Sequence, residues 1–162
     1  MKLMTQKIAI ASDHAGRLLK EKVVNLLPSL SFEILDFGVA AHEDGSVHYP
    51  DFAEKVTRAI VGQKAKKGIL ICGTGIGMCV AANKFPGIRA TSVWDEVTAK
   101  MSRLHNDSNV LCLGERVLSA DKALEVTKIW LSTPFEKEGR HQFRLDKISD
   151  IENRNFRYES SH

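Results

Sequence analysis

Short apolar runs alternate with amphipathic segments along most of this chain, and that alternation limits the fold more than any other feature. The runs are bounded by Gly, Pro, Asp and Ser, and they read as strands. Between them, apolar residues recur at helical spacing, as after Pro50 and after Ser119. The pattern predicts an α/β protein with a parallel sheet. The expected strands are residues 7–12, 32–37, 67–72, 88–93 and 110–113.

Length and composition predict one domain that covers residues 1–162. A chain of 162 residues, 43% of them hydrophobic, is long enough to bury a substantial core, and no linker or repeat divides it. From Thr133 onward the sequence turns polar and charged, and a last helix is expected from about Arg144. We expect the segment 133–162 to pack against another surface, such as a partner subunit.

Charge and hydropathy disfavour nucleic-acid-binding and membrane-embedded proteins. With 23 Lys+Arg against 20 Asp+Glu, and with only 7% aromatic residues, the chain offers little for a polyanion or for base stacking. It has no apolar run of about 18 residues and no signal peptide, so we expect no membrane contact. Three cysteines without a CxxC pair indicate neither a disulfide framework nor a zinc site, and we expect a cytoplasmic protein.

The strongest chemical signal is the glycine-rich loop after the third expected strand. Residues 69–72 run directly into Gly73-Thr74-Gly75-Ile76-Gly77, and a helical pattern follows. Backbone N–H groups in such a turn converge on an anion, and a thiol at its edge, here Cys72, becomes reactive there. The spacing lacks the register of a dinucleotide fingerprint and the Lys-Ser/Thr of a P-loop. The pattern favours an anion or oxyanion cradle over a purely structural tight turn.

Three further groups of polar residues accompany the loop. Asp13 and His14 follow the first strand, where an aspartate also serves as a helix cap. A polar run begins at His105 before the fifth strand, although turn chemistry explains much of it. Arg140 and Arg144 would share one helix face and suit bidentate phosphate binding, although a solvated basic face also explains them. Because ligands collect at the carboxyl ends of parallel strands, we expect the first two groups to gather there with the loop.

Several motifs follow one another in a recognisable order. They are Ser12-Asp13-His14-Ala15-Gly16, Tyr49-Pro50-Asp51, residues 68–77, Ala82-Asn83-Lys84, Gly87-Ile88-Arg89-Ala90, residues 105–111 and Gly139-Arg140-His141. The chain resembles the ribose-5-phosphate isomerase B family, within a wider family that includes allose- and galactose-6-phosphate isomerases, over about residues 7–155. The resemblance implies a Rossmann-like three-layer αβα sandwich with a five-stranded parallel sheet. It also implies a homodimer with shared active sites, with a tetramer as the alternative assembly.

The same resemblance implies interconversion of ribose 5-phosphate and ribulose 5-phosphate through an enediolate, without a metal or an organic cofactor. Cys72 is similar to the base that moves a proton between C1 and C2. His105, with Thr74 and Asp13, is similar to the groups that open the sugar ring, and Asn106 to one that holds substrate hydroxyls. The other implied binding residues are Gly73, Gly75, Ile76 and Gly77 for the enediolate, and His14, Arg116, Arg140 and Arg144 for the phosphate.

Two positions depart from the family pattern. His48 stands where an acidic residue commonly precedes Tyr-Pro-Asp, and Lys137-Glu138 stands where glycine is usual. Cysteine at position 72 favours the five-carbon substrate. Two alternatives are an isomerase of six-carbon sugar phosphates, such as allose or galactose 6-phosphate, and a non-catalytic phosphosugar-binding protein that uses the same cradle.

Overall fold

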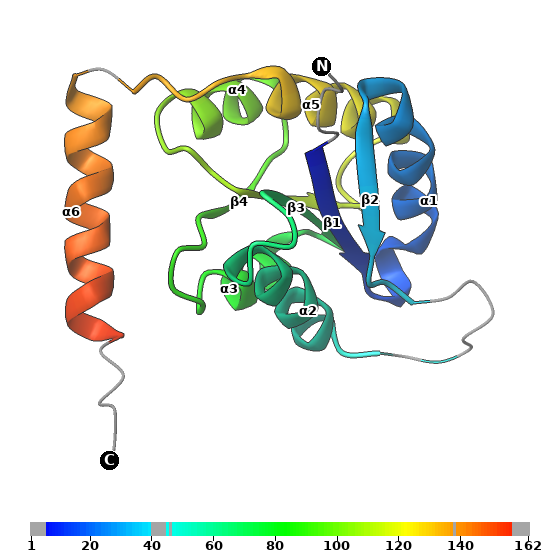
Figure 1. Ribbon diagram of the computed structural model, residues 1–162. Helices are drawn as coiled ribbons and strands as arrows, with labels where there is room; N and C mark the ends of the chain where they lie inside the picture. The colour runs from blue at the N-terminus through cyan, green and yellow to red at the C-terminus, as the bar shows by residue number, and fades with distance from the viewer. Residues whose placement is uncertain (1–5, 40–44, 46, 138, 157–162) are drawn as a thin grey trace, which may run out of the picture.

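The computed structural model describes residues 6–39, 45, 47–137 and 139–156, and it shows an α/β fold built on one sheet (Figure 1). The strands are Gln6–Ser12 (β1), Phe32–Asp36 (β2), Lys67–Cys72 (β3), Ala90–Ser92 (β4) and Val110–Gly114 (β5). Their order is β2-β1-β3-β5-β4, and every neighbouring pair is parallel. The predicted five-stranded parallel sheet is confirmed.

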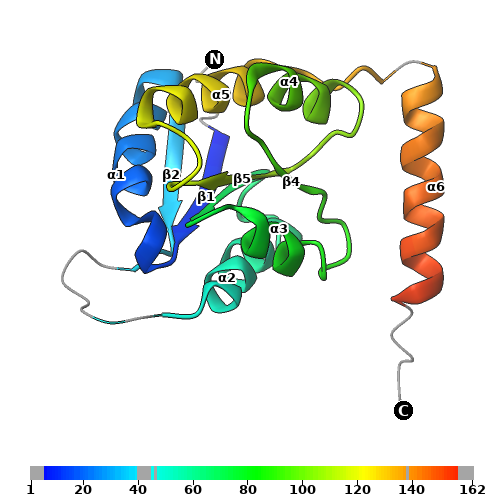
Figure 2. The same cartoon turned by 180° about the vertical axis from the view of Figure 1, so that it is seen from behind.

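Helices cover both faces of this sheet and complete the three-layer αβα arrangement that the resemblance implied. The α-helices of the described chain are Arg17–Leu26 (α1), Tyr49–Val61 (α2), Ile76–Ala82 (α3), Glu96–Leu104 (α4), Ala120–Ser132 (α5) and Arg140–Asn155 (α6). In both views α1, α4 and α5 lie on one face of the sheet, and α2 and α3 lie on the other (Figure 1, Figure 2). α6 belongs to neither layer and stands to one side of them.

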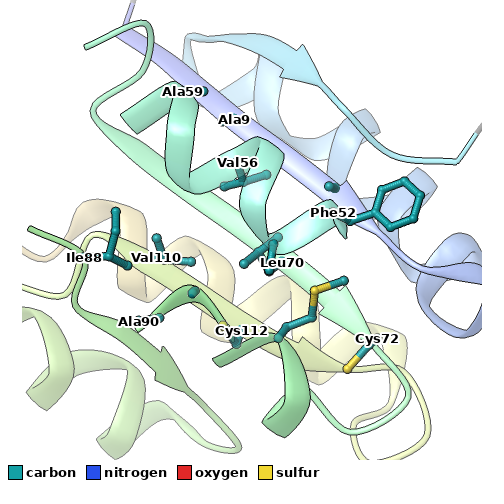
Figure 3. Packing of buried hydrophobic residues seen from close by; sticks show 14 of the residues in the cluster. Ala9, Phe52, Val56, Ala59, Leu70, Cys72, Ile88, Ala90, Val110 and Cys112 are labelled. Carbon is teal, nitrogen blue, oxygen red and sulfur yellow. The ribbon is translucent and has the colours of Figure 1, made fainter. Parts of the chain in front are cut away.

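Each face of the sheet has its own hydrophobic core, because successive strand residues point to opposite sides. Ile69 and Ile71 of β3 are fully buried in the core beneath α1, α4 and α5. Leu70 and Cys72 point the other way and share a core with Val56 of α2 (Figure 3). Cys72 therefore ends β3 on the face that α2 and α3 cover.

Two predicted helix starts depend on side-chain caps that the structure confirms. Oδ1 of Asp95 accepts a hydrogen bond from the backbone N–H of Thr98 (2.7 Å), and Oγ1 of Thr98 accepts one from the N–H of Asp95 (3.3 Å). This reciprocal pair is a capping box and fixes the start of α4. Oγ of Ser119 likewise accepts the N–H of Lys122 (3.3 Å) at the start of α5.

Two elements have bounds that differ from the prediction by more than one residue. β4 is shorter than the expected 88–93, because the backbone N–H of Arg89 donates to Oδ1 of Asn109 (2.8 Å) instead of joining the strand ladder. α6 begins at Arg140, one turn before the expected Arg144, directly after Gly139 with its positive φ of 78°. In the described part of the chain, no helix has both the length and the apolar character needed to cross a membrane.

The segment 133–137 leads from α5 to α6, which has few contacts with the rest of the chain. The N–H of Glu136 donates to the carbonyl of Leu104 (3.1 Å), and the N–H of Gly87 donates to Oε1 of Glu152 on α6 (2.9 Å). α6 therefore presents an apolar surface that this chain does not cover. Its exposed large apolar side chains are Phe143, Ile148 and Ile151, and Phe156 follows at its end.

Candidate active site

A backbone hydrogen bond joins the carboxyl ends of β1 and β3. The N–H of Asp13 donates to the carbonyl of Ile71 (3.2 Å), so the first residue after β1 lies beside the last residues of β3. Asp13 is only 6% exposed, and its Oδ1 accepts the N–H of Ala15 (2.9 Å) in the short 3-10 turn His14–Gly16. The capping interpretation of Asp13 is confirmed, and the cap holds its carboxylate at the strand end that carries Cys72.

The glycine loop turns its backbone toward the thiol of Cys72. The N–H of Gly75 donates to Sγ of Cys72 (3.1 Å), and Cys72 is 5% exposed. Gly75 has a φ of 79°, and an added Cβ would lie 3.0 Å from the carbonyl carbon of Leu113. Only glycine combines this left-handed conformation with such a close approach. The loop therefore directs a backbone donor at the sulfur.

Arg116, Thr74 and His14 lie around the same loop. The N–H of Arg116 donates to the carbonyl of Gly73 (2.9 Å), and its guanidinium group lies against Gly73, since a Cβ built there would be 3.3 Å from Nη1. Thr74 is exposed, and its Oγ1 accepts the N–H of Ile76 (3.4 Å). His14 is exposed and accepts the N–H of Val47 at Nδ1 (3.4 Å). We call Asp13, His14, Arg116 and residues 72–77 the thiol cluster.

His105 and Asn106 lie at the amino ends of the strands, whereas the glycine loop lies at the carboxyl ends. The expectation that they join the loop is therefore wrong for a single chain. The parallel register pairs Gly68 with Val110 at one end and Cys72 with Gly114 at the other. Because β5 starts only at Val110, the residues before it lie at the amino ends of the strands. A strand rises about 3.3 Å per residue, so the two ends of β5 are separated by roughly 13 Å.

His105 stacks on His141 in the first turn of α6. The ring centroids are 4.0 Å apart, and the rings are inclined by 6°. His141 is 5% exposed and its Nε2 lies 3.8 Å from Oε2 of Glu136. Burial lowers the pKa of His141, and the neighbouring His105 and Arg140 lower it further. The sequence motif at residues 139–141 contained His141, but no role was assigned to it.

The two predicted arginines of α6 follow this stack. Arg140 and Arg144 are both exposed and belong to one helix, four residues apart, as the prediction required. We call His105, Asn106, Arg140, His141 and Arg144 the histidine cluster. Of the two departures from the family pattern, His48 precedes α2 as its N-cap without a side-chain cap bond, and Glu138 lies outside the described residues.

One group of described residues offers atoms that commonly bind metals. Ligating atoms of His105, Glu136 and His141 lie within 4.8 Å of one another. Imidazole lone pairs lie in the ring planes, and the two rings here are nearly parallel. The two lone pairs therefore cannot point at the same tetrahedral ion unless one ring rotates. The arrangement fits a ring stack better than a metal site.

The whole chain from β1 to α6 matches a known family. The family model described as Ribose/Galactose Isomerase matches residues 8–148. The chain belongs to the ribose/galactose isomerase family. The ribose-5-phosphate isomerase B of Escherichia coli (strain K12) is 42% identical over 149 residues, which cover 92% of this chain and 98% of that protein.

Solved structures of this family agree with the fold. A ribose-5-phosphate isomerase B of Clostridium thermocellum is 46% identical, with a TM-score of 0.87, over 92% of this chain and 99% of that one. The Mycoplasma genitalium enzyme, solved with bound ribulose-5-phosphate, is 40% identical, with a TM-score of 0.86, over 93% and 98% of the two chains.

Proposed function

We propose that this member of the ribose/galactose isomerase family interconverts D-ribose 5-phosphate and D-ribulose 5-phosphate, a step of the pentose phosphate pathway. The hydrogen bond from the Gly75 N–H to Sγ of Cys72 carries the proposal, because it joins the sulfur that would act as the base to the backbone of the glycine loop. The family match and the names of the related enzymes support the choice of reaction.

The proposed chemistry moves protons and needs no net oxidation or reduction. In the open-chain aldose, the Cys72 thiolate removes the proton from C2, and the electron pair forms the C1–C2 double bond while the C1 carbonyl becomes an enediolate oxygen. Backbone N–H groups of residues 73–77 stabilise that oxygen, a contribution of roughly 3 kcal/mol for each well-placed donor. The proton of the C2 hydroxyl passes to the C1 oxygen, and the thiol then returns its proton to C1 as the C2 carbonyl forms. Ring opening beforehand is assigned to His105, assisted by Thr74 and Asp13.

We also propose a homodimer in which each active site draws on two chains, with a tetramer as a possible larger assembly. The histidine cluster lies at the opposite edge of the sheet from Cys72, so a second copy is needed to bring His105, Asn106 and the two arginines to the thiol. The uncovered apolar side chains of α6 fit such a contact, within the charged segment 133–162. The free state of all three cysteines suits the reducing cytoplasm.

The deciding experiment is an assay of wild type, Cys72→Ala and Cys79→Ala on ribose 5-phosphate and allose 6-phosphate. We expect Cys72→Ala to lose turnover and the exchange of the C2 proton with solvent, and Cys79→Ala, altered within α3 behind the loop, to keep both. Undiminished turnover by Cys72→Ala would remove the thiol from the base role. Higher efficiency on allose 6-phosphate would favour the six-carbon alternative, and binding without proton exchange would favour the phosphosugar-binding protein.

A further inference from the structure

A large open hollow lies at the amino ends of the strands, whereas Cys72 lies at their carboxyl ends. Its volume is about 820 Å³. Gln6 at the start of β1, Lys67 at the start of β3 and Asn109 just before β5 line its floor. Phe135, in the segment that leads to α6, forms part of its wall. The proposed isomerase chemistry uses none of these residues.

The charge lining this hollow is strongly unbalanced. Among the described residues that line it, Asp107 is the only carboxylate. Five lining side chains are cationic: Lys66, Lys67, Arg89, Arg103 and Lys137. The whole protein has nearly equal numbers of basic and acidic residues, 23 against 20. The positive charge of the hollow is therefore a local excess and does not follow from the composition.

The one carboxylate is already shared between two guanidinium groups. Oδ2 of Asp107 accepts a hydrogen bond from Nη2 of Arg89 (2.8 Å), and Oδ1 accepts one from Nη1 of Arg103 (2.8 Å). Arg103 is only 7% exposed, and its Nε donates to the carbonyl of Thr133 (3.3 Å). The hydrogen bonds of Arg89 use Nε and Nη2, and those of Arg103 use Nε and Nη1. Each guanidinium therefore keeps one amino group that no described residue bonds.

Lys67 lies in this hollow, in surroundings that disfavour its positive charge. Its Nζ donates to the carbonyl of Leu131 (3.3 Å) and lies 5.2 Å from the centre of the Trp130 ring. Burial and the nearby charge of Arg103 lower the pKa of Lys67, and Asp107 partly opposes them, so that the pKa is about 8. Lys66, Arg89 and Lys137 add further positive charge to the same lining. An anion bound here would favour the protonated amine and relieve this repulsion.

We propose that the hollow is a second anion site, distinct from the sugar-phosphate site, and that it binds a small molecule carrying a diphosphate group. The remaining amino group of each guanidinium can donate to a phosphate oxygen, and Lys66, Lys67 and Lys137 supply further positive charge. A single phosphate would leave about half of this charge uncompensated, whereas a diphosphate comes closer to balancing it. The volume also leaves room for an organic group beside Phe135.

Calorimetric titration of the full-length protein with pyrophosphate tests this site. The test variant is Lys66→Gln/Lys137→Gln, because both side chains are exposed at the rim and their loss leaves the core intact. We expect its pyrophosphate affinity to fall about tenfold or more, the loss expected from removing charge-assisted contacts. The matched control is Lys22→Gln, an exposed lysine of α1 outside the hollow, which should bind as the wild type does. The variant Lys67→Gln is a second test, at a lysine that is more buried.

Two further measurements separate this site from the active site and from non-specific binding. Arg140→Gln/Arg144→Gln should still bind pyrophosphate, because those residues lie outside the hollow. Titrations at pH 8 in two buffers of different ionisation enthalpy should show proton uptake by wild type and none by Lys67→Gln. Equal affinity in wild type and Lys66→Gln/Lys137→Gln, or binding lost only in the Arg140/Arg144 variant, would overturn the proposal. Binding of inorganic phosphate as tight as that of pyrophosphate would overturn the diphosphate assignment.

Discussion

The imidazole rings of His105 and His141 are nearly parallel, with centroids 4.0 Å apart, and this stack ties the end of α4 to the first turn of α6. The contact fixes the position of the first turn of α6 and therefore the position of Arg140. A helix with so few other contacts depends on this stack for its position. The stack is thus a positioning element for the residues assigned to phosphate binding.

Removing the stack should weaken substrate binding more than it slows the chemical step. For His141→Ala we expect KM for ribose 5-phosphate to rise about tenfold, because the arginines of α6 lose their fixed position. His141→Phe retains a flat ring against His105 and should stay near the wild-type KM. Steady-state kinetics of both variants check this, and equal effects of Ala and Phe would contradict a stacking role.

The lowered pKa of His141 predicts how stability changes with pH. In the unfolded chain a histidine titrates near its ordinary value of about 6.5, so as pH falls the unfolded state takes up a proton before the folded state does. Stability is therefore fully present above that pH and declines as pH drops below it. Urea midpoints at pH 7.5 and 5.5 should differ more in wild type than in His141→Phe. An identical pH dependence in both proteins would show that His141 is not the cause.

Gly75 should be intolerant of substitution for two separable reasons. Gly75→Ala strains a left-handed backbone, which costs about 1–2 kcal/mol, and it also pushes a methyl group against Leu113 beside the thiol. Gly87→Ala is a matched control, since its φ is 77° but nothing lies within 4 Å of an added Cβ. We expect both variants to lose stability, and only Gly75→Ala to lose about 100-fold in kcat. Similar kcat values for the two variants would exclude a role for the loop geometry.

Subunit mixing tests whether each site is built from two chains. Cys72→Ala lacks the base, and Arg140→Gln/Arg144→Gln lacks the proposed phosphate contacts, so each protein alone should be nearly inactive. In a mixed dimer one of the two sites would regain every group, and random pairing would restore about one quarter of wild-type activity. Refolding equal amounts of the two variants together and assaying turnover checks this. No recovery, despite mixed dimers shown by mass spectrometry, would place both clusters in one chain.

The Arg103–Asp107 pair should contribute measurably to stability. Asp107→Asn leaves the largely buried guanidinium of Arg103 without its charge partner, and we expect a loss of about 2 kcal/mol, below the full value for a buried pair because Asp107 is partly exposed. Glu54→Gln breaks the exposed i,i+4 pair with Arg58 and should cost less than about 0.5 kcal/mol. Urea unfolding of both variants measures the difference, and comparable losses would show that burial does not matter here.

Local patterns predicted the parts of this molecule that local physics determines. The strand 67–72 and the caps at Asp95 and Ser119 were predicted correctly, because strand hydrophobicity and capping depend on neighbouring residues. The end of the strands at which His105 lies was predicted wrongly, because His105 precedes its strand and so lies at the amino end, whereas the prediction grouped it with residues that follow their strands. The contact of His141 with His105 depends on the tertiary placement of α6, which no local pattern encodes. The catalytic roles themselves rest on resemblance and stay predictions.

The placement of the two clusters at opposite edges of one sheet has a consequence for the life of the protein in the cell. A newly synthesised chain carries every group that the proposed reaction requires, yet it cannot bring the Cys72 edge and the His105 edge together by folding alone. Under the proposed assembly, catalysis would begin only when chains become abundant enough to meet. Specific activity would then follow protein concentration, and dilution would act as an inhibitor.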